Sequence, residues 1–195
     1  GQPLPEHEVE SYEHPQIAPE TGTIFEHCRR AIDRGLTSGP HGLPLIGTGD
    51  WNDGMNRVGP EGRGESTWLG FFIYTVLNDF IPICEGRNER ELASRYREVM
   101  RHLASRLEAA WDGEWYRRGY YDDGTPLGSA QNDECQIDSI SQSWAMLSGA
   151  VPRRFAERAL DAVRASLVVR PSRILLLLAP PFDKSDRDPG YIKGY

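Results

Sequence analysis

The chain has 195 residues, 38% hydrophobic and 26% charged, with a formal net charge of −7, a mixture typical of a globular protein rather than a disordered one. No block is rich in lysine or arginine, which argues against nucleic acid or an anionic membrane as the main partner, because both select basic surfaces. No uninterrupted apolar run approaches the roughly 20 residues of a membrane-spanning helix.

The cysteines and the two ends of the sequence indicate the setting. Cys28, Cys84 and Cys135 are odd in number and widely spaced, so neither a disulfide framework nor a metal site is predicted, and a reducing cytoplasm fits best. The sequence opens on Gly1 without an initiator Met or a signal peptide, and it stops at GYIKGY. We therefore expect a segment of a longer protein.

The first 66 residues are predicted to contain one helix between two irregular stretches. Residues 1–20 hold four prolines and few apolar residues, which predicts an extended linker or loop. Thr21 or Thr23 can cap a helix that ends near Gly35 or Gly39, since apolar residues follow at three- and four-residue spacing. Residues 38–66 form a glycine-rich loop, and a loop of that length is usually functional or disordered.

Two helices of different character are predicted next. Ser66 or Thr67 can cap a helix over residues 67–84 that is apolar nearly all round, so we expect it to be covered on all sides in an inner layer. Asn88 and Glu91 resemble a capping box. They precede a helix with an apolar face from Leu92 to Trp111 and a charged opposite face. That pattern predicts an outer, half-exposed helix.

The last third is predicted to repeat this alternation after a short hairpin. Residues 115–124 read as an extended segment and a turn. Ile137, Ile140, Trp144 and Leu147 predict a second inner helix that ends at Gly149. An amphipathic helix follows Pro152, and the run ILLLLAPPF (174–182) comes after it. Apolar helices alternating with amphipathic ones predict an all-α fold of two concentric layers.

The strongest candidate for chemistry is the stretch Gly49-Asp50-Trp51-Asn52-Asp53-Gly54. Cleavage of a glycosidic bond needs a carboxylic acid that protonates the departing oxygen and holds its proton near neutral pH. A neighbouring carboxylate and a desolvating indole both favour the protonated form of a carboxyl group. Trp51 can also stack on a sugar ring. The pattern thus allows Asp53, with Asp50 nearby, to act as such an acid.

Two other interpretations compete for the same stretch. Asp, Asn and Gly are the commonest turn residues, so a plain turn is about as well supported by composition. Asp50, Asn52 and Glu61 imitate three positions of a calcium-binding EF-hand loop, but Met55 occupies its obligatory glycine position, which argues strongly against that site.

Four longer stretches carry a resemblance to a known family: GLPLIGTGDWNDGMNRVG with GESTWLGFFIY, EWYRRGYYDDGTPLGS, NDECQIDSISQSWAMLSG and APPFDKSDRDPGYIKGY. The sequence from about Glu20 to its last residue resembles glycoside hydrolase family 94, the inverting β-glucoside phosphorylases. The ECQIDSISQSW wording is most similar to the branch formed by the C-terminal phosphorylase-like domain of cyclic β-1,2-glucan synthases.

The resemblance implies a fold and a reaction. It implies that residues 21–195 are an incomplete (α/α)6-barrel catalytic domain with long glycine-rich loops and a short β-hairpin. Asp53 would be the general acid, and Trp51 would line the subsite for the glucosyl unit. Inorganic phosphate would be the nucleophile and co-substrate, with no cofactor, attacking the anomeric carbon from the face opposite the leaving group. Phosphate is already anionic, so no second carboxylate is needed, and Asp50 becomes a structural or tuning neighbour.

The resemblance is incomplete at the phosphate site. The family's phosphate-binding residues include a His in a motif expected shortly beyond Tyr195, and none of the five histidines of this sequence sits in such a motif. We therefore expect the segment to carry the acid without a complete phosphate site, so that it can be inactive when isolated.

Further substrate-binding candidates are weaker. Asn52 flanks the acid, and Arg118 follows in a charged stretch that either lines a sugar cleft or forms a surface hairpin with paired charges. Glu134 and Gln142 flank Asp138 in an arrangement suited to bidentate hydrogen bonds with sugar hydroxyls. Helix capping by Asp138 is the alternative.

Several functions remain open at this point. The first is a phosphorylase segment acting on β-glucosidic bonds, most consistently on β-1,2-glucan, with cellobiose- or chitobiose-type disaccharide phosphorylases as variants. An inverting hydrolase on the same barrel and a non-catalytic glucan-binding segment of a large synthase are the others. The expected partners are a β-glucan or β-linked disaccharide, phosphate, the remainder of the parent polypeptide and a second copy in a homodimer. The parent can be anchored in an inner membrane.

Overall fold

The structure is a computed structural model of the 195-residue chain that describes residues 11–12, 14–184 and 187–194. Residues 1–10 and 13, half of the predicted linker, lie outside the described part. Residues 11–12 and 14–20 are exposed and form neither helix nor strand. The division into a linker (1–20) and a domain (21–195) stays a prediction.

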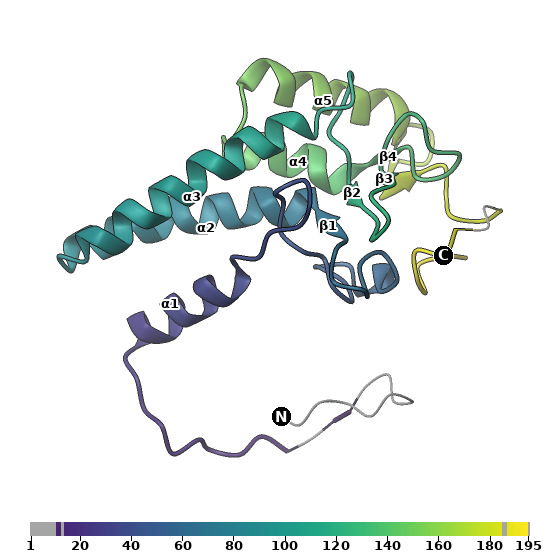
Figure 1. The fold of residues 1–195 in the computed structure, drawn as a ribbon. Coiled ribbons are helices and arrows are strands. Elements are labelled where there is room, and N and C mark those ends of the chain that lie inside the picture. Colours follow the sequence, from purple (N-terminus) through teal and green to yellow (C-terminus); the bar gives the residue numbers. More distant parts are fainter. Residues whose placement is uncertain (1–10, 13, 185–186, 195) are drawn as a thin grey trace.

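Helices contain most of the residues in regular secondary structure, as predicted (Figure 1). The helices of the described residues are α1 (Ile24–Gly35), the short 3₁₀ turn η1 (Asp53–Met55), α2 (Thr67–Gly86), α3 (Arg90–Ala109), α4 (Ser139–Ser148) and α5 (Arg153–Ser166). The strands are β1 (Glu65–Ser66), β2 (Gly119–Tyr120), β3 (Pro126–Leu127), β4 (Ile137–Asp138), β5 (Val168–Val169), β6 (Ile174–Leu175) and β7 (Leu178–Ala179).

The helices form two hairpins that pack against each other. Helix α2 runs alongside α3, and α4 runs alongside α5 (Figure 1). The hairpins meet where α2 packs on α4, which leaves α3 and α5 on the outside. This agrees with the predicted alternation of inner and outer helices and is compatible with an all-α fold. The complete (α/α)6 barrel stays a prediction.

The helix starts follow the capping chemistry of the sequence in two cases and depart from it in one. Thr23 and Glu26 form a full capping box at α1, and the Ser66 hydroxyl accepts the backbone N–H of Leu69 at the start of α2. The capping box predicted at Asn88 is wrong. Asn88 has a φ of 63° in the turn after α2, and Glu89, the residue directly before α3, makes no side-chain capping bond. The tight connection needs a left-handed residue there, which removes Asn88 from the capping position.

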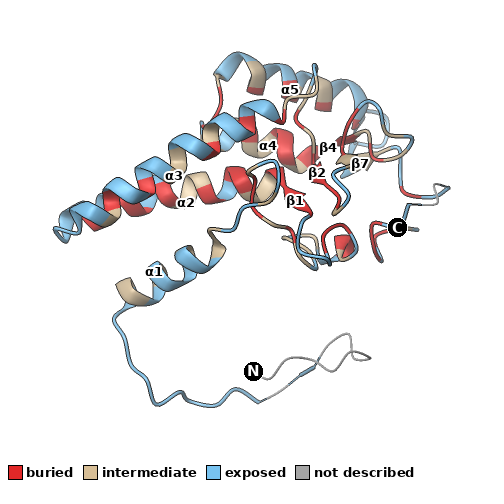
Figure 2. Cartoon of the chain, in the orientation of Figure 1, coloured by how far each residue is buried: buried red, intermediate tan, exposed pale blue. Residues whose placement is uncertain are grey.

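The main core lies between α2, α3 and α4 (Figure 2). Phe71 and Leu77 of α2 pack with Tyr96 and Leu107 of α3, all fully buried. Helix α2 is not covered on all sides, contrary to our expectation. Phe72 and Ile83 are 37% and 51% exposed, because α3 and α4 supply most of its neighbours and leave one face open.

Helix α2 is also, by length and composition alone, long and apolar enough to cross a membrane. Of its most apolar 18 residues, 44% are buried inside the fold, and its buried large apolar side chains belong to the main core. Core helices of globular proteins commonly combine this length and composition, so the finding is weak evidence for a membrane span.

Helix α4 buries a different face from the predicted one. Leu147 is 69% exposed, whereas Ser139, Ser141, Gln142 and Ala145 are buried. Its polar residues can be inside because they are hydrogen-bonded, as the Gln142 amide is to the backbone of Tyr116. A satisfied polar group can replace an apolar one at little cost. Gly149 ends the helix in the left-handed conformation, as predicted.

Short strands tie the loops to the helix starts. Strands β1, β2 and β3 form an antiparallel sheet in which Glu65 pairs with Tyr120 and Ser66 with Gly119. The turn between β2 and β3 is the predicted hairpin. Strand β4 pairs with β7, and β5 pairs with β6. The strands β1 and β4 each run directly into a helix, so the sheet edges hold the N-termini of α2 and α4.

Candidate active site

The loop that carries Asp53 is held by two consecutive side-chain turns. The Asp50 carboxylate accepts the backbone N–H of Asn52 at 3.0 Å, and the Asn52 side chain accepts that of Gly54 at 3.0 Å. Asp53 begins η1 between these anchors. Gly49 has a φ of +127°, and a Cβ there would lie 2.9 Å from the Cα of Asp53. Only glycine permits the backbone at residue 49 to come this close to the backbone of Asp53. The side chains of Asp50 and Asn52, both common turn residues, hold the loop in this shape.

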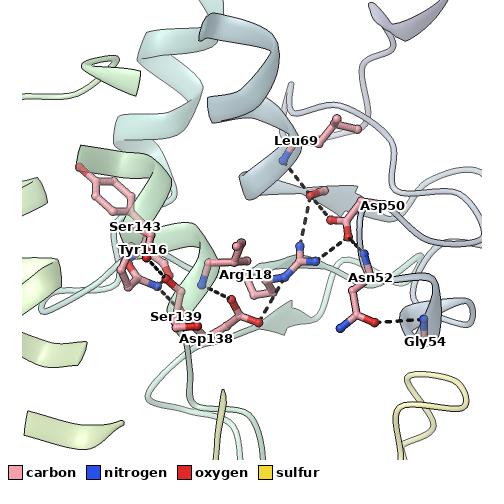
Figure 3. Close-up of polar contacts among 12 residues, drawn as sticks. Asp50, Asn52, Gly54, Leu69, Tyr116, Arg118, Asp138, Ser139 and Ser143 are labelled. Carbon is pink, nitrogen blue, oxygen red and sulfur yellow. Dashed lines mark hydrogen bonds and ion pairs between the residues drawn. The ribbon is translucent and has the colours of Figure 1, made fainter. Parts of the chain in front are cut away.

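A buried arginine anchors this loop to both inner helices (Figure 3). The Arg118 guanidinium donates to Asp50 Oδ1 at 2.7 Å and to Ser66 Oγ at 3.2 Å. Its Nε lies 3.4 Å from Asp138 Oδ2. The side chains of Arg118 and Asp50 are wholly buried and that of Asp138 nearly so. Because Ser66 caps α2 and Asp138 caps α4, one cation joins the loop that carries Asp53 to two helix starts.

The pKa values of the two carboxylates beside Arg118 are shifted in opposite directions. Burial alone would raise the pKa of Asp50, but the charge of Arg118 and hydrogen bonds from Arg118, Ser66 and Asn52 outweigh it and lower that pKa below its ordinary value. Burial raises the pKa of Asp138, and the more distant guanidinium only partly offsets it. The arrangement favours an ionised Asp50 and resists the ionisation of Asp138.

Asp53 itself borders an open cavity. It is exposed, and it lines a cavity of about 290 Å³ with the rest of its loop and with a second segment. The lining residues are Trp51, Asn52, Asp53, Gly54, Leu177, Tyr191 and Ile192. Among the residues that the structure describes, none donates a hydrogen bond to the Asp53 carboxyl. The side chain is therefore available to a ligand in the cavity.

The second segment that lines this cavity comes from the C-terminal part of the chain, which lies beside the loop of Asp53 (Figure 1). The backbone N–H of Ile192 donates to the Gly54 carbonyl at 2.9 Å, and that of Arg57 donates to the Pro189 carbonyl at 3.1 Å. Arg57 also pairs with Asp188 at 2.5 Å. These bonds attach the C-terminal wall of the cavity to the loop that carries Asp53.

Trp51 lines the same cavity, and its ring is partly exposed. It is 45% exposed, and its ring contacts Trp68 edge-on at a centroid distance of 6.5 Å. Trp68 stacks on Phe72 at 5.4 Å, and both rings meet Trp144 edge-on. An aromatic face that is partly exposed and held at its edge by other rings suits stacking on the apolar face of a sugar.

The structure brings some of the predicted site residues together and separates others. Asp50, Asn52 and Arg118 share one hydrogen-bonded network with the loop of Asp53. Gln142 is fully buried and exchanges hydrogen bonds of 2.8 and 2.9 Å with the backbone of Tyr116. Its Nε2 also donates to the Asp138 carbonyl at 2.9 Å, behind Arg118. Substrate binding by these residues stays a prediction.

Glu134 lies apart from this network. Its carboxylate accepts the backbone N–H of Asp183 at 2.9 Å and that of Lys184. It borders a different cavity, of about 430 Å³, with Asp133 and the Pro180-Pro181 pair. Substrate binding by Glu134 is likewise still a prediction.

Sequence reasoning missed two contributions to this site. Ser66 was expected only as a helix cap, yet its hydroxyl also donates to Asp50 Oδ2 at 2.6 Å. Leu177, Tyr191 and Ile192 line the cavity although they follow Asp53 by more than 120 residues. The proline and glycine at 189–190 are the one local signal that this segment turns sharply. Across the described ranges, no group of three or more His, Cys, Asp or Glu residues could hold a metal ion.

Comparison with known proteins identifies the family. The catalytic domain of the glycosyl hydrolase 94 superfamily matches residues 6–195. The chain belongs to this superfamily. The match begins farther toward the N-terminus than the stretches that carried the resemblance, and it includes most of the predicted linker.

Several known proteins are similar to this chain over most of its length. The cyclic β-(1,2)-glucan synthase NdvB of Rhizobium meliloti (strain 1021) is 49% identical over 100% of the chain and 7% of its own length. The 3-O-β-D-glucopyranosyl-β-D-glucuronide phosphorylase of Paenibacillus borealis is 38% identical over 84% of the chain and 21% of its length. The cellobionic acid phosphorylase of Neurospora crassa is 36% identical over 87% of the chain and 22% of its length.

The chain thus spans less than a quarter of each of these relatives. Their names describe a glucan synthase and phosphorylases, so the family assignment places the chain in the catalytic domain of a carbohydrate-active enzyme family.

Proposed function

We propose that this chain supplies the general-acid portion of an inverting glycoside phosphorylase or glycosyltransferase domain that cleaves β-glucosidic bonds, with β-1,2-glucan as the substrate class. The observation that carries the proposal is the position of Asp53. Its carboxyl is exposed at a cavity, without a competing hydrogen-bond partner among the described residues, on a loop whose neighbours are anchored.

In this proposal the reaction proceeds in one displacement. A phosphate oxygen forms a bond to the anomeric carbon while the glycosidic bond breaks, and the Asp53 carboxyl gives its proton to the departing sugar oxygen. The configuration inverts because attack and departure occur on opposite faces. Trp51 stacks on the glucosyl ring beside the acid. The rest of the parent polypeptide completes the (α/α)6 barrel and provides the phosphate site.

The 49% sequence identity to the cyclic β-(1,2)-glucan synthase supports the choice of β-1,2-glucan as the substrate class. The disaccharide phosphorylases, at 36–38% identity, support the alternative of a β-linked disaccharide substrate. An inverting hydrolase would instead need a second carboxylate about 6.5–9.5 Å from the acid to activate water. Asp50 does not suit that task, since its carboxylate is buried and bonded to Arg118 and Ser66.

The test uses the full-length parent protein, a β-1,2-linked diglucoside and inorganic phosphate. We expect glucose 1-phosphate to form only when phosphate is present, and we expect Asp53→Asn to slow its formation by roughly 100-fold or more, the usual scale of general acid catalysis. Asp161→Asn is the matched control, because Asp161 is exposed on α5. Equal sugar release with and without phosphate would disprove the phosphorylase, and an unimpaired Asp53→Asn would favour the non-catalytic binding segment.

A further inference from the structure

The Asp53 side chain is placed by its backbone, and the side chains of Asp50 and Asn52 hold that backbone on both sides of the residue. Asp50 fixes the N–H of Asn52, and Asn52 fixes that of Gly54. The Asp50 carboxylate is thus the root of a short chain of hydrogen bonds that ends on either side of the acid. A residue that holds Asp50 in place therefore also helps to position the Asp53 side chain at the cavity.

Asp50 is held by Arg118. The guanidinium bonds to Asp50 directly and also through Ser66, whose hydroxyl contacts both residues. Figure 3 shows Arg118 between Asp50 on one side and Asp138 on the other. All three partners of the guanidinium are buried, so solvent does not screen these interactions and none of them can easily exchange for water.

The helices give this anchor its rigidity. Ser66 and Asp138 are the capping residues of α2 and α4, and these helices pack directly on each other. A catalytic group held by residues that are themselves locked by packing keeps its geometry better than one on a free loop.

We propose that Arg118 is a positioning residue for Asp53: it fixes the Asp50 end of the acid loop to the starts of α2 and α4 and so holds the acid at the departing oxygen. The inference rests on the proposed function. It assigns no contact between Arg118 and the sugar, since the side chain is fully buried. The lowered pKa of Asp50 agrees with it, because an ionised Asp50 holds Arg118 more strongly.

A test must separate misplacement of the acid from general loss of structure. Two substrates do so in the full-length parent protein with inorganic phosphate. A β-1,2-linked diglucoside needs a proton on its leaving oxygen. β-D-Glucosyl fluoride reacts by the same displacement, in which the C1–F bond breaks and fluoride leaves with the electron pair, and it depends far less on the acid. A residue that acts through Asp53 must affect the first substrate selectively.

For Arg118→Lys we expect kcat on the diglucoside to fall roughly 10- to 100-fold, within the range of general acid catalysis, while the rate with glucosyl fluoride changes by less than about threefold. Asp53→Asn should show the same selectivity more strongly. The matched control is Arg117→Lys, since the neighbouring Arg117 pairs with Asp112 at 2.7 Å and makes no bond to Asp50. That control should not discriminate between the substrates.

Equal losses on both substrates for Arg118→Lys, or no loss on either, would overturn the positioning role. These outcomes differ from failure of the proposed function, in which Asp53→Asn itself would show no selectivity. Should Arg118→Lys not fold, Asp138→Asn decides by the same criterion, because it retains the size and the capping oxygen of Asp138 and replaces the carboxylate oxygen that faces Arg118 Nε by an amide N–H₂.

Discussion

Ile192 donates its backbone N–H to the carbonyl of Gly54, the residue that follows Asp53, at 2.9 Å. This bond joins two segments separated by more than 130 residues and forms one wall of the cavity at the acid. The same wall is tied down at Arg57, through Pro189 and Asp188. The loop that carries Asp53 and the C-terminal segment are therefore one structural unit. A substitution in either segment should change the local stability of both.

Gly190 is the position at which this unit can be broken with a single methyl group. Its φ is +120°, and a Cβ would lie 2.1 Å from Asn56 Oδ1 and 2.5 Å from the Gly54 carbonyl oxygen. We expect Gly190→Ala to lower the free energy of unfolding by about 1–3 kcal/mol and to speed amide hydrogen exchange at 54–57. Gly194→Ala is the control, because Gly194 has a φ of +91° with no heavy atom near its Cβ position. Equal exchange in both variants would refute the coupling.

Glu65 should be sensitive to loss of its charge. It is fully buried and accepts the backbone N–H groups of His41 and Leu43 and the ring Nδ1 of His41, the last at 2.5 Å. In Glu65→Gln an amide N–H₂ replaces one of the two carboxylate oxygens, so this buried network loses its negative charge and one of its acceptors. We expect a loss of about 1–3 kcal/mol in unfolding free energy, measured by denaturant titration.

The control for that variant is Glu61→Gln, since the Glu61 side chain is exposed and pairs with Arg63 at the surface. Its effect should stay within about 0.5 kcal/mol. A cost as large as that of Glu65→Gln would show that the burial of Glu65 is not the cause.

The two carboxylates beside Arg118 should respond to pH in opposite directions. Asp50 has a lowered pKa, so it stabilises the fold above its ordinary value of 3.8 and loses that contribution as the pH falls. Asp138 has a raised pKa, so the fold favours its protonated form, and stability declines as the pH rises above 3.8 through the raised value. The deficit of Asp50→Asn should therefore grow with pH, while that of Asp138→Asn should shrink.

The measurement is denaturant unfolding of both variants and the unaltered protein from about pH 2 to pH 8, because the contribution of Asp50 changes mainly below its ordinary pKa of 3.8. The two variants control for each other, because each replaces one carboxylate in the same network by the same amide. Parallel pH dependences would contradict the opposite pKa shifts of Asp50 and Asp138.

Trp51 should matter for binding more than for folding. Its ring is 45% exposed and touches one neighbouring ring edge-on. In the parent protein we expect Trp51→Ala to raise KM roughly 5- to 10-fold, which corresponds to about 1 kcal/mol of aromatic stacking, with little change in Tm. Trp51→Phe keeps a flat apolar ring and should recover most of the affinity. A large loss of Tm for Trp51→Ala would assign the ring to the core instead.

Local sequence signals predicted the helices of this chain well. Thr23, Ser66 and Gly149 each act within four residues of their own position, and such short-range chemistry can be read from the order of residues. Asn88 shows the limit, because the tight turn between α2 and α3 demanded a left-handed residue and overrode the capping pattern.

Burial and the candidate site were harder to predict. Arg118 looked like a surface or cleft residue, and only the meeting of Asp50, Ser66 and Asp138 around it makes a buried arginine tolerable. Gln142 is inside for the same reason, since the backbone of Tyr116 satisfies its amide. Partners that lie tens of residues away leave no periodic trace in the sequence.

Strand β1 sets a limit on how this site can change. Its two residues point to opposite sides: Glu65 holds the His41 loop, and Ser66 holds Asp50 and Arg118. Side chains alternate along a strand, so inserting or deleting one residue next to β1 would exchange a carboxylate for a hydroxyl on both sides at once. The glycine-rich loop can therefore vary in length at its exposed tip near Gly62, whereas the spacing from Glu65 to the start of α2 is fixed by two networks simultaneously.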